Sequence, residues 1–580
     1  MKKLSFVLAS LSLSLFSFAQ STPITYKMTL GEEIKLKKGT ADLDIIAADN
    51  TGLYFTEQRT AKTLFTIGAP PQSYKLYKID KNFGEVFDKE YKKELKGLDF
   101  QSFQTLDKDL FLFATDYEKK GRLFKVYGAK VDKNSGDLAG DFSELGSYAL
   151  ENKRDDYDMK VSPIHNGDAF LMVSNISAAD RVSLGISLLN KSLKKIESTV
   201  INMAFQPSHY QLADVQFTKN KKIVVLGKEF EETQIGKKKK KRLVFKQYVM
   251  SIYNADGEKE KDVLLNADNR FIISGKLIEQ PNGELLLAGF YSNEPRKEDL
   301  NGFYINKVDA EKGQLLLSSF KEINSGMLGK AYEDAADEDD EMKESKKQSK
   351  KAKDSDEEEE FPNSFLIKSV DINPADNSIV ITSEVSQYSY YSYATYNYNP
   401  GTRTSATTWH YVHRFTNHDI LIINADQNGN IKWLNALPKS QLEEVRTTRN
   451  SYGSGWSYSY DRSGYFATAG GMPFYSSYKS LIHNNNLVLL LNDHTSNNVN
   501  PEYGDRVKTV SNFRKRSNAY GVSVDLATGK ITRKNIASNN DETVLMPRHA
   551  FVVKNEIFVP SWRQKLMAKT ELRFAKIVVK

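Results

Sequence analysis

The sequence of 580 residues contains no cysteine. This absence excludes disulfides, thiol nucleophiles, zinc–thiolate sites and iron–sulfur clusters, because each of them needs a cysteine sulfur. A chain of this length can still bury enough apolar surface to fold without disulfides. The net charge is also small, +7 from 81 basic and 74 acidic residues. Such a mild excess gives little support for a nucleic-acid partner, and none is predicted.

Long apolar runs are also missing. Met1, Lys2 and Lys3 precede an apolar stretch that ends near Phe18, which is shorter than the roughly 18 to 20 residues of a membrane helix. A charged start, a short apolar run and the small residue Ala19 form the pattern of a secretory signal peptide. We expect residues 1–19 to be a signal peptide cleaved near Ala19, and no transmembrane segment. The mature chain is expected to be extracytoplasmic, either periplasmic or secreted.

The motifs of common enzymes are absent as well. The sequence has no nucleophile elbow, no P-loop and no His-Glu-x-x-His motif. The only local group of histidines is His410, His413 and His418. On a strand the first two point to opposite faces, so they cannot hold one metal together. No catalytic residue, no metal site and no cofactor is predicted, and a non-catalytic protein is favoured over an enzyme.

The sequence does contain two series of turns. In the first series a hydrophobic residue is followed by Asp or Asn and, in most copies, by Gly a few residues later. Asp or Asn can bond its own backbone two residues on, and Gly allows the chain to reverse, so this pattern predicts hairpins. The copies lie at Asp80, Asp132, Asn190, Asn254, Asp309, Asn424 and Asp525.

The second series of turns leads into short apolar runs. Runs such as Ile223–Leu226 are apolar at consecutive positions, which indicates strands buried on both faces. Where no insertion intervenes, copies are separated by about 50 to 65 residues, the length of one four-stranded propeller blade. The eight copies begin near Asn50, Asp107, Asn166, Asn220, Asn282, Asp376, Asn484 and Lys554.

The two series alternate along the chain. They predict an all-β fold, a single β-propeller over residues 20–580 with eight four-stranded blades, and seven blades as the alternative. The last blade lacks one strand, and the segment Pro23–Leu36 is a strand without a blade. We expect this N-terminal strand to pair with the C-terminal blade and close the ring, because closure removes exposed sheet edges.

The stretch "INADQNGNIKW" (423–433) admits a calcium loop or a hairpin turn. Asn424, Asp426 and Asn428 match the first half of a calcium-binding loop, but Asn435 stands where such a loop needs Glu. A structural turn is therefore favoured.

The long insertions all fall in connectors that should emerge on one face of the ring. Residues 326–362 form a charged insertion that we expect to be a mobile spacer. Residues 386–411 and 440–471 are aromatic-rich insertions of Tyr, Trp, Ser, Gly and Asn, a composition typical of binding surfaces. Alternatively, they fold over each other and cap the ring. The candidate binding residues are Tyr390, Tyr393, Trp409, Trp456 and Tyr460.

The Asp-x-x-x-Gly turns resemble those of the eight-bladed quinoprotein-like and WD40-like β-propeller superfamily. That superfamily includes quinone-dependent dehydrogenases and a non-enzymatic outer-membrane assembly factor. Its docking tryptophan occurs once here, as Trp433, and the vicinal cysteines of the dehydrogenases are impossible, so no quinone cofactor is expected. The chain is also similar to exported propellers of Bacteroidota.

Together these features predict a non-catalytic exported propeller. It would bind an envelope protein or glycan through long loops on one face, as a monomer or within a hetero-complex. The alternatives are a glycan-active hydrolase or lyase with its site in the central funnel, and a scaffold subunit of an envelope complex.

Overall fold

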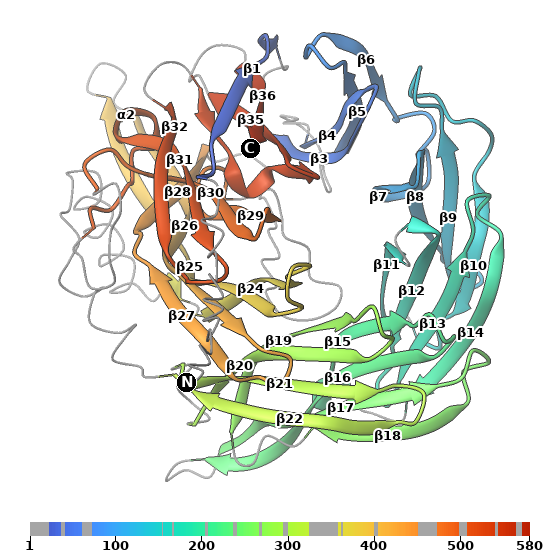
Figure 1. The fold of residues 1–580 in the computed structure, drawn as a ribbon. Helices are drawn as coiled ribbons and strands as arrows, with labels where there is room; N and C mark the ends of the chain where they lie inside the picture. Colours follow the sequence, from blue (N-terminus) through green and yellow to red (C-terminus); the bar gives the residue numbers. More distant parts are fainter. Residues whose placement is uncertain are drawn as a thin grey trace, which may run out of the picture.

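A computed structural model describes residues 23–35, 41–60, 72–152, 155–164, 167–203, 207–235, 240–265, 270–293, 300–323, 358–360, 364–399, 404–450, 473–497, 507–539, 543–563 and 571–580. Nearly all of the regular secondary structure in these residues is β-strand, and most strands form four-stranded antiparallel sheets, as in a β-propeller. The sheets follow one another in chain order around a common centre (Figure 1). Residues 1–19, where a signal peptide is expected, and most of the charged insertion 326–362 lie outside the described residues.

We number the eight sheets of the described residues 1 to 8 in chain order. Sheets 1 to 5 and sheet 7 each consist of four strands consecutive in the chain. Their strands are β3 (Ala41–Asp49), β4 (Gly52–Thr60), β5 (Gln72–Ile79), β6 (Glu85–Glu90); β7 (Asp99–Leu106), β8 (Asp109–Glu118), β9 (Leu123–Val131), β10 (Ser143–Ala149); β11 (Asp156–Ile164), β12 (Ala169–Ser177), β13 (Val182–Leu189), β14 (Lys195–Met203); β15 (Tyr210–Phe217), β16 (Ile223–Ile235), β17 (Lys240–Tyr253), β18 (Lys259–Leu265); β19 (Phe271–Glu279), β20 (Leu285–Ser292), β21 (Gly302–Asp309), β22 (Gln314–Glu322); and β29 (Tyr478–His483), β30 (Asn486–His494), β31 (Ser517–Asp525), β32 (Ile531–Ser538).

Sheets 6 and 8 have six strands each. Sheet 8 contains the N-terminal strand β1, which pairs antiparallel with β36 from Tyr26 opposite Val579 to Leu30 opposite Ala575. The strands of sheet 6 are β23 (Glu358–Glu360), β24 (Ser364–Ile372), β25 (Ile379–Asn399), β26 (Thr404–Ala425), β27 (Ile431–Leu437) and β28 (Gln441–Asn450), and those of sheet 8 are β33 (Val544–Leu545), β34 (Phe551–Val553), β35 (Glu556–Arg563), β36 (Glu571–Val579), β1 (Tyr26–Leu30) and β2 (Ile34–Lys35). The short helices are η2 (Pro207–His209), α2 (Phe513–Arg516) and η4 (Pro547–His549).

The turns of the first series lie between the third and fourth strands of sheets 1 to 5 and 7, and between β26 and β27 in sheet 6. The stretch 423–433 is one of them: the Asp426 carboxylate accepts the backbone N–H groups of Asn428 and Asn430, both at 2.8 Å. Gly429 has φ +79°, a conformation that favours glycine. The preferred interpretation, a structural turn, describes this segment.

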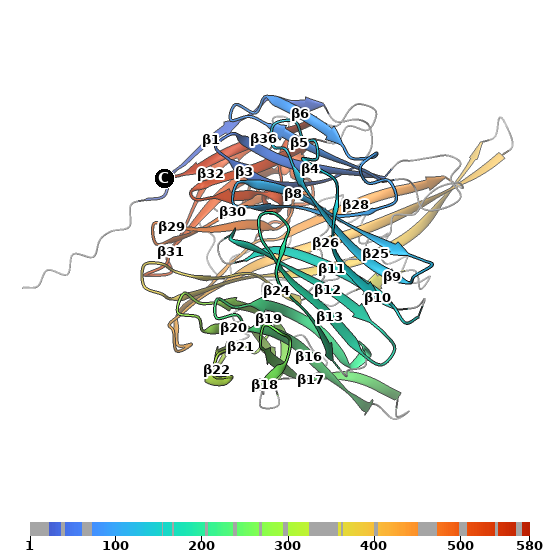
Figure 2. The same ribbon diagram turned by 90° about the vertical axis from the view of Figure 1, so that its right-hand side faces the viewer.

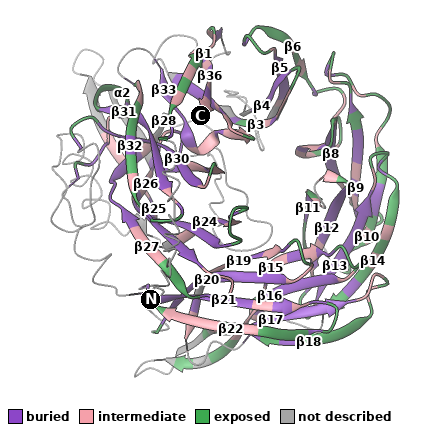
Figure 3. Ribbon diagram, viewed as in Figure 1, coloured by how far each residue is buried: buried purple, intermediate pink, exposed green. Residues whose placement is uncertain are grey.

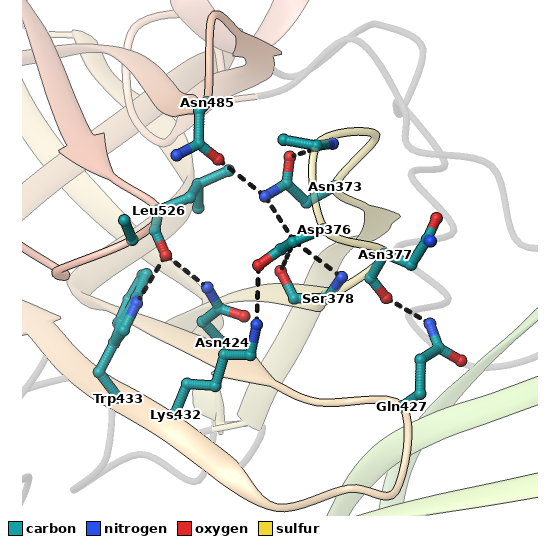
Figure 4. A network of polar contacts seen from close by, with 12 residues as sticks. Asn373, Asp376, Asn377, Ser378, Asn424, Gln427, Lys432, Trp433, Asn485 and Leu526 are labelled. Carbon is teal, nitrogen blue, oxygen red and sulfur yellow. Dashed lines mark hydrogen bonds and ion pairs between the residues drawn. The ribbon is translucent and has the colours of Figure 1, made fainter. Parts of the chain in front are cut away.

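These turns also join neighbouring sheets. A Cβ atom on Gly529, in the turn of sheet 7, would lie 2.9 Å from the Trp433 ring on β27 of sheet 6. The indole N–H of Trp433 donates to the Leu526 carbonyl at 3.0 Å, and the Asn424 amide donates to the same oxygen at 2.8 Å (Figure 4). Glycine is required in this turn because the neighbouring side chain fills the space.

The same contact recurs without tryptophan. The turn glycines Gly136, Gly257, Gly313 and Gly429 each pack against a side chain on the fourth strand of the preceding sheet, and these side chains are Phe87, Thr199, Lys261 and Ser319. Between sheets 8 and 1 the roles are exchanged. A Cβ on Gly31, which follows β1, would lie 2.4 Å from Phe83 in the turn of sheet 1. The N-terminal strand therefore occupies the place of a fourth strand in this contact.

The buried residues concentrate on the middle strands of the sheets (Figure 3). All residues of β20 and β30 are buried, as the continuous apolar runs predict. No helix in the described part of the chain is both long and apolar enough to cross a membrane.

Candidate functional site: an aromatic arm on sheet 6

The two central strands of sheet 6 are much longer than those of other sheets. From Ile379 to Glu384, β25 pairs with β24 and with the part of β26 that continues to β27. Beyond Ser386 and Asn417 the two strands leave the sheet and acquire new partners, β23 on one side and β28 on the other. We call residues 386–399, 404–417 and 441–450 the arm. Figure 2 shows the arm projecting on the same side as the β16–β17 hairpin.

The arm corrects one expectation from the sequence. Residues 386–411 were predicted as a loop insertion, yet β25 extends to Asn399 and β26 begins at Thr404. The physical reason is composition: tyrosine and threonine fit a pleated strand, and the polar residues between them tolerate exposure. Cross-strand pairs such as Tyr393 opposite His410 then form along the hairpin.

One face of the arm, which we call the near face, packs on the ring of sheets. Tyr388 and Phe415 share a buried cluster with Phe474 and with Trp562 of sheet 8. The Tyr388 hydroxyl lies 2.8 Å from Nδ1 of His413. Burial lowers the pKa of His413 to about 4, so this imidazole is neutral at pH 7. The near face therefore attaches the arm to the ring of sheets.

The opposite face, which we call the far face, carries a stacked pair. The rings of Tyr393 and His410 are parallel within 8°, with centroids 4.6 Å apart, and both side chains are partly exposed. Beside them, the Arg414 guanidinium lies 5.1 Å from the ring of Tyr391 and donates to the Glu444 carboxylate at 3.0 Å. This face combines a partly exposed aromatic stack with a largely buried ion pair.

The base of the arm contains a fully buried ion pair. Lys439 Nζ and the Glu384 carboxylate lie 2.6 Å apart, and both side chains are 0% exposed. Lys368 approaches the second carboxylate oxygen at 3.1 Å, and Ser477 of the next connector donates to it at 2.6 Å. Burial alone would raise the pKa of Glu384, but Lys439 and Lys368 outweigh it and lower the pKa to about 2. Burial lowers the pKa of Lys439.

A second buried carboxylate fixes the connector to sheet 7. Glu443, on β28, accepts the backbone N–H groups of Phe474, Tyr475 and Ser476 at 2.7, 2.9 and 2.8 Å. Burial raises the pKa of Glu443, and these three donors oppose that rise. Gln441, one pleat before it, donates to the Asn492 carbonyl of β30 at 2.6 Å. The arm is therefore rigidly held at its base by sheets 6, 7 and 8.

The structure separates the residues that the sequence grouped as one surface. Tyr390 lies on the near face, 5.0 Å from the His413 ring, whereas Tyr393 lies on the far face. The backbone of Trp409 pairs with Ala394 and Arg449, and its side chain lies outside the described part. Trp456 and Tyr460 also lie outside the described residues.

Sequence reasoning did not include His410 and Arg414, which lie on the far face with Tyr393, among the candidate binding residues. The only signal for His410 and Arg414 was an i, i+4 spacing, which places them on one face of a strand once the strand is known. Within the described residues no group of three His, Asp or Glu side chains is placed to hold a metal ion.

A comparison with protein-family models finds none that matches the chain, and none of the curated proteins matches it. Among solved structures, the chain is similar to the β-propeller domain of the Trilobed protease from Pyrococcus furiosus, with 10% identity, a TM-score of 0.30 and coverage of 69% of this chain and 97% of that chain. It is similar to a protein of unknown function from Dyadobacter fermentans, with 9% identity, a TM-score of 0.27 and coverage of 74% and 96%. A third is an endo-arabinase from Bacteroides thetaiotaomicron, with 12% identity, a TM-score of 0.21 and coverage of 51% and 98%. No functional conclusion is drawn from these likenesses.

Proposed function

We propose that the chain is an eight-bladed β-propeller, closed by its N-terminal strand, that binds a partner in the cell envelope through the far face of the arm. The eight sheets and the pairing of β1 with β36 support the architecture. The signal-peptide pattern of residues 1–19 supports export, to the periplasm or the cell exterior. The partner is a protein or a glycan, and the chain acts on it by binding, not by catalysis.

The observation that carries this proposal is the partly exposed Tyr393–His410 stack on an anchored arm. A surface that is already rigid loses little conformational entropy on binding, and that loss is a main cost of association. Aromatic rings supply large contact area with few rotatable bonds. Arg414 adds a planar donor group, although Glu444 already accepts from it. The far face therefore has the properties of a binding surface.

Binding is favoured over catalysis because the charged groups of the arm are used structurally. Lys439, Glu384 and Glu443 are buried, and each contacts named partners in the arm base. His413 is buried against Tyr388. A general acid or base must reach a substrate proton within about 3 Å, directly or through one water. These groups face protein atoms and not an open site.

The test is quantitative affinity purification from native envelope extract. Three versions of the full chain are compared: the wild type, a Tyr393→Ala/His410→Ala variant, and a Tyr157→Ala control. Tyr157 is an exposed tyrosine on β11 that also stacks on a neighbour, Tyr117, at 5.5 Å, so its loss removes a similar ring from another surface.

We expect one protein or glycan to be enriched by the wild type and the control and depleted about tenfold or more with the double variant, the size of effect that a central contact residue gives. Treatment of the extract with glycosidases or with protease identifies which class of partner is bound. Equal recovery by all three versions would refute the proposal for the far face.

A further inference from the structure

The innermost strands of sheets 1 to 7 carry a polar residue at one common level. Lys160 on β11 pairs with Val173, which pairs with Ile186, and Ile186 stands four residues before the turn residue Asn190. The same pairing sequence, counted back four residues from each first-series turn residue, or from Asp426 in sheet 6, identifies one residue in every one of these sheets. These residues are Asp44, Ser102, Lys160, Asp214, Lys276, Ser369 and Lys479. We call them the inner ring.

Every member of the inner ring is exposed or partly exposed, and each adjoins at least one buried residue. Lys160 is exposed, while Met159 and Val161 on either side are 6% and 4% exposed. Lys276 is exposed and Lys479 partly exposed, and they adjoin the buried Leu277 and Tyr478. No member of the ring is apolar or buried. Figure 1 shows their strands, β3, β7, β11, β15, β19, β24 and β29, on the inner side of the sheets. Water therefore reaches these side chains along the inside of the ring of sheets.

The lysines of the inner ring come from sheets that span half of the ring, with one carboxylate between them. Lys160, Lys276 and Lys479 come from sheets 3, 5 and 7, and the one carboxylate of the ring among them is Asp214 of sheet 4. Asp214 attracts both Lys160 and Lys276, whereas Lys276 repels Lys479. Three ammonium groups against one carboxylate leave an excess of two positive charges.

The other carboxylate of the inner ring lies on sheet 1. Asp44 has its Oδ1 atom 3.6 Å from Nδ1 of His549, in the short helix η4. The negative charge of Asp44 therefore faces an imidazole and does not compensate the three lysines.

We propose that Lys160, Lys276 and Lys479 bind a small anion that carries two or more carboxylate or phosphate groups. Ammonium groups on separate strands act as separate point charges, so a ligand with several oxyanion groups can satisfy more than one of them. When a channel is lined mainly by positive charge, its low-dielectric protein walls strengthen the electrostatic attraction for an anionic ligand. This site is formed by other residues than the arm, and it does not depend on the proposed partner.

The test is isothermal titration calorimetry of the full chain at low ionic strength. Citrate probes carboxylates, pyrophosphate probes phosphates, and glycerol is the uncharged control. The variants are Lys276→Gln and Lys479→Gln, which keep most of the side-chain length, and Asp214→Asn, which removes the competing carboxylate. Lys195→Gln is the matched control, because Lys195 is exposed on the outer strand β14.

We expect the wild type to bind citrate or pyrophosphate and not glycerol, with the better of the two anions defining the class. Each ring lysine variant should bind about tenfold more weakly, since it loses one close charge contact. Asp214→Asn should bind several-fold more tightly, a gain that damage to the fold cannot produce. The Lys195→Gln control and the Tyr393→Ala/His410→Ala arm variant should bind as the wild type does, which separates this site from the arm. No anion binding, or the same loss for Lys195→Gln, would overturn the proposal.

Discussion

Replacing one partner of the buried Glu384–Lys439 pair should destabilise the protein strongly and unequally. Without Lys439, Glu384 keeps Lys368 at 3.1 Å and the Ser477 hydroxyl at 2.6 Å. Without Glu384, Lys439 keeps only Gln441 Oε1 at 3.0 Å among the contacts described. Loss of one partner of a buried pair costs about 3 to 5 kcal/mol. We therefore expect Lys439→Met near the lower end of that range and Glu384→Gln near the upper end.

The Glu384–Lys439 pair should also make the free energy of unfolding depend on pH. The folded-state pKa of Glu384 is about 2, below its ordinary value of 4.5. Its stabilisation is therefore complete above about pH 4.5 and is lost as the pH falls toward 2. The lowered pKa of Glu384 corresponds to about 3 kcal/mol of stabilisation from this carboxylate alone. Because burial lowers the pKa of Lys439, the net stabilisation by the pair is smaller than that figure.

The assay is the free energy of unfolding from urea titration of the wild type, both single variants and the double variant, at pH 7 and at pH 3. The double variant should cost less than Glu384→Gln alone, because it no longer leaves the Lys439 ammonium group buried without its carboxylate. Between pH 7 and pH 3 the wild type should lose stability that Glu384→Gln does not lose. Additive effects of the two substitutions, or the same pH dependence in Glu384→Gln, would refute this account of the arm base.

Three further predictions concern the sheets. Trp433→Ala should lower the free energy of unfolding by about 3 kcal/mol, because it removes a large ring and leaves the Leu526 carbonyl with one donor fewer; urea titration measures the loss. Gly529→Ala should cost about 1 to 3 kcal/mol through its φ of +75° and the close Trp433 ring, and this cost should shrink in the Trp433→Ala background. Burial raises the pKa of Asp214 from 3.8 to about 6, so its contribution to stability is present below about pH 4 and lost as the pH rises through 6. Because the side chain is partly exposed, that loss should be about 1 to 2 kcal/mol, and Asp214→Asn should abolish it in unfolding titrations at pH 4 and 7.

The turns could be predicted from the sequence because their chemistry is local. Asp426 bonds the N–H groups two and four residues on, and Gly429 has positive φ, so every requirement lies within five residues. The position on the preceding sheet against which each turn glycine packs could be recognised in the sequence only where tryptophan occupies it. Phe87, Thr199 and Lys261 make the corresponding contact without any common side chain.

The arm could not be predicted in the same way. Its tyrosines are compatible with a binding loop or with strands. The pairing with β28 decides between them, and β28 begins only at Gln441, 24 residues after its partner Asn417. The base depends on contacts between residues far apart, such as Lys439 with Glu384, 55 residues earlier. The sequence does not reveal that the inner-ring residues share one level, because β-bulges in β15 and β24 shift the strand register by one residue.

The most direct test of the proposed binding surface is site-specific photo-crosslinking in the native envelope. A photoreactive phenylalanine analogue replaces Tyr393 on the far face of the arm, Tyr390 on the near face, or the exposed Tyr157 on β11. The account predicts a discrete crosslinked species from position 393 and none from positions 390 and 157. A crosslink from position 157 with none from position 393 would contradict it.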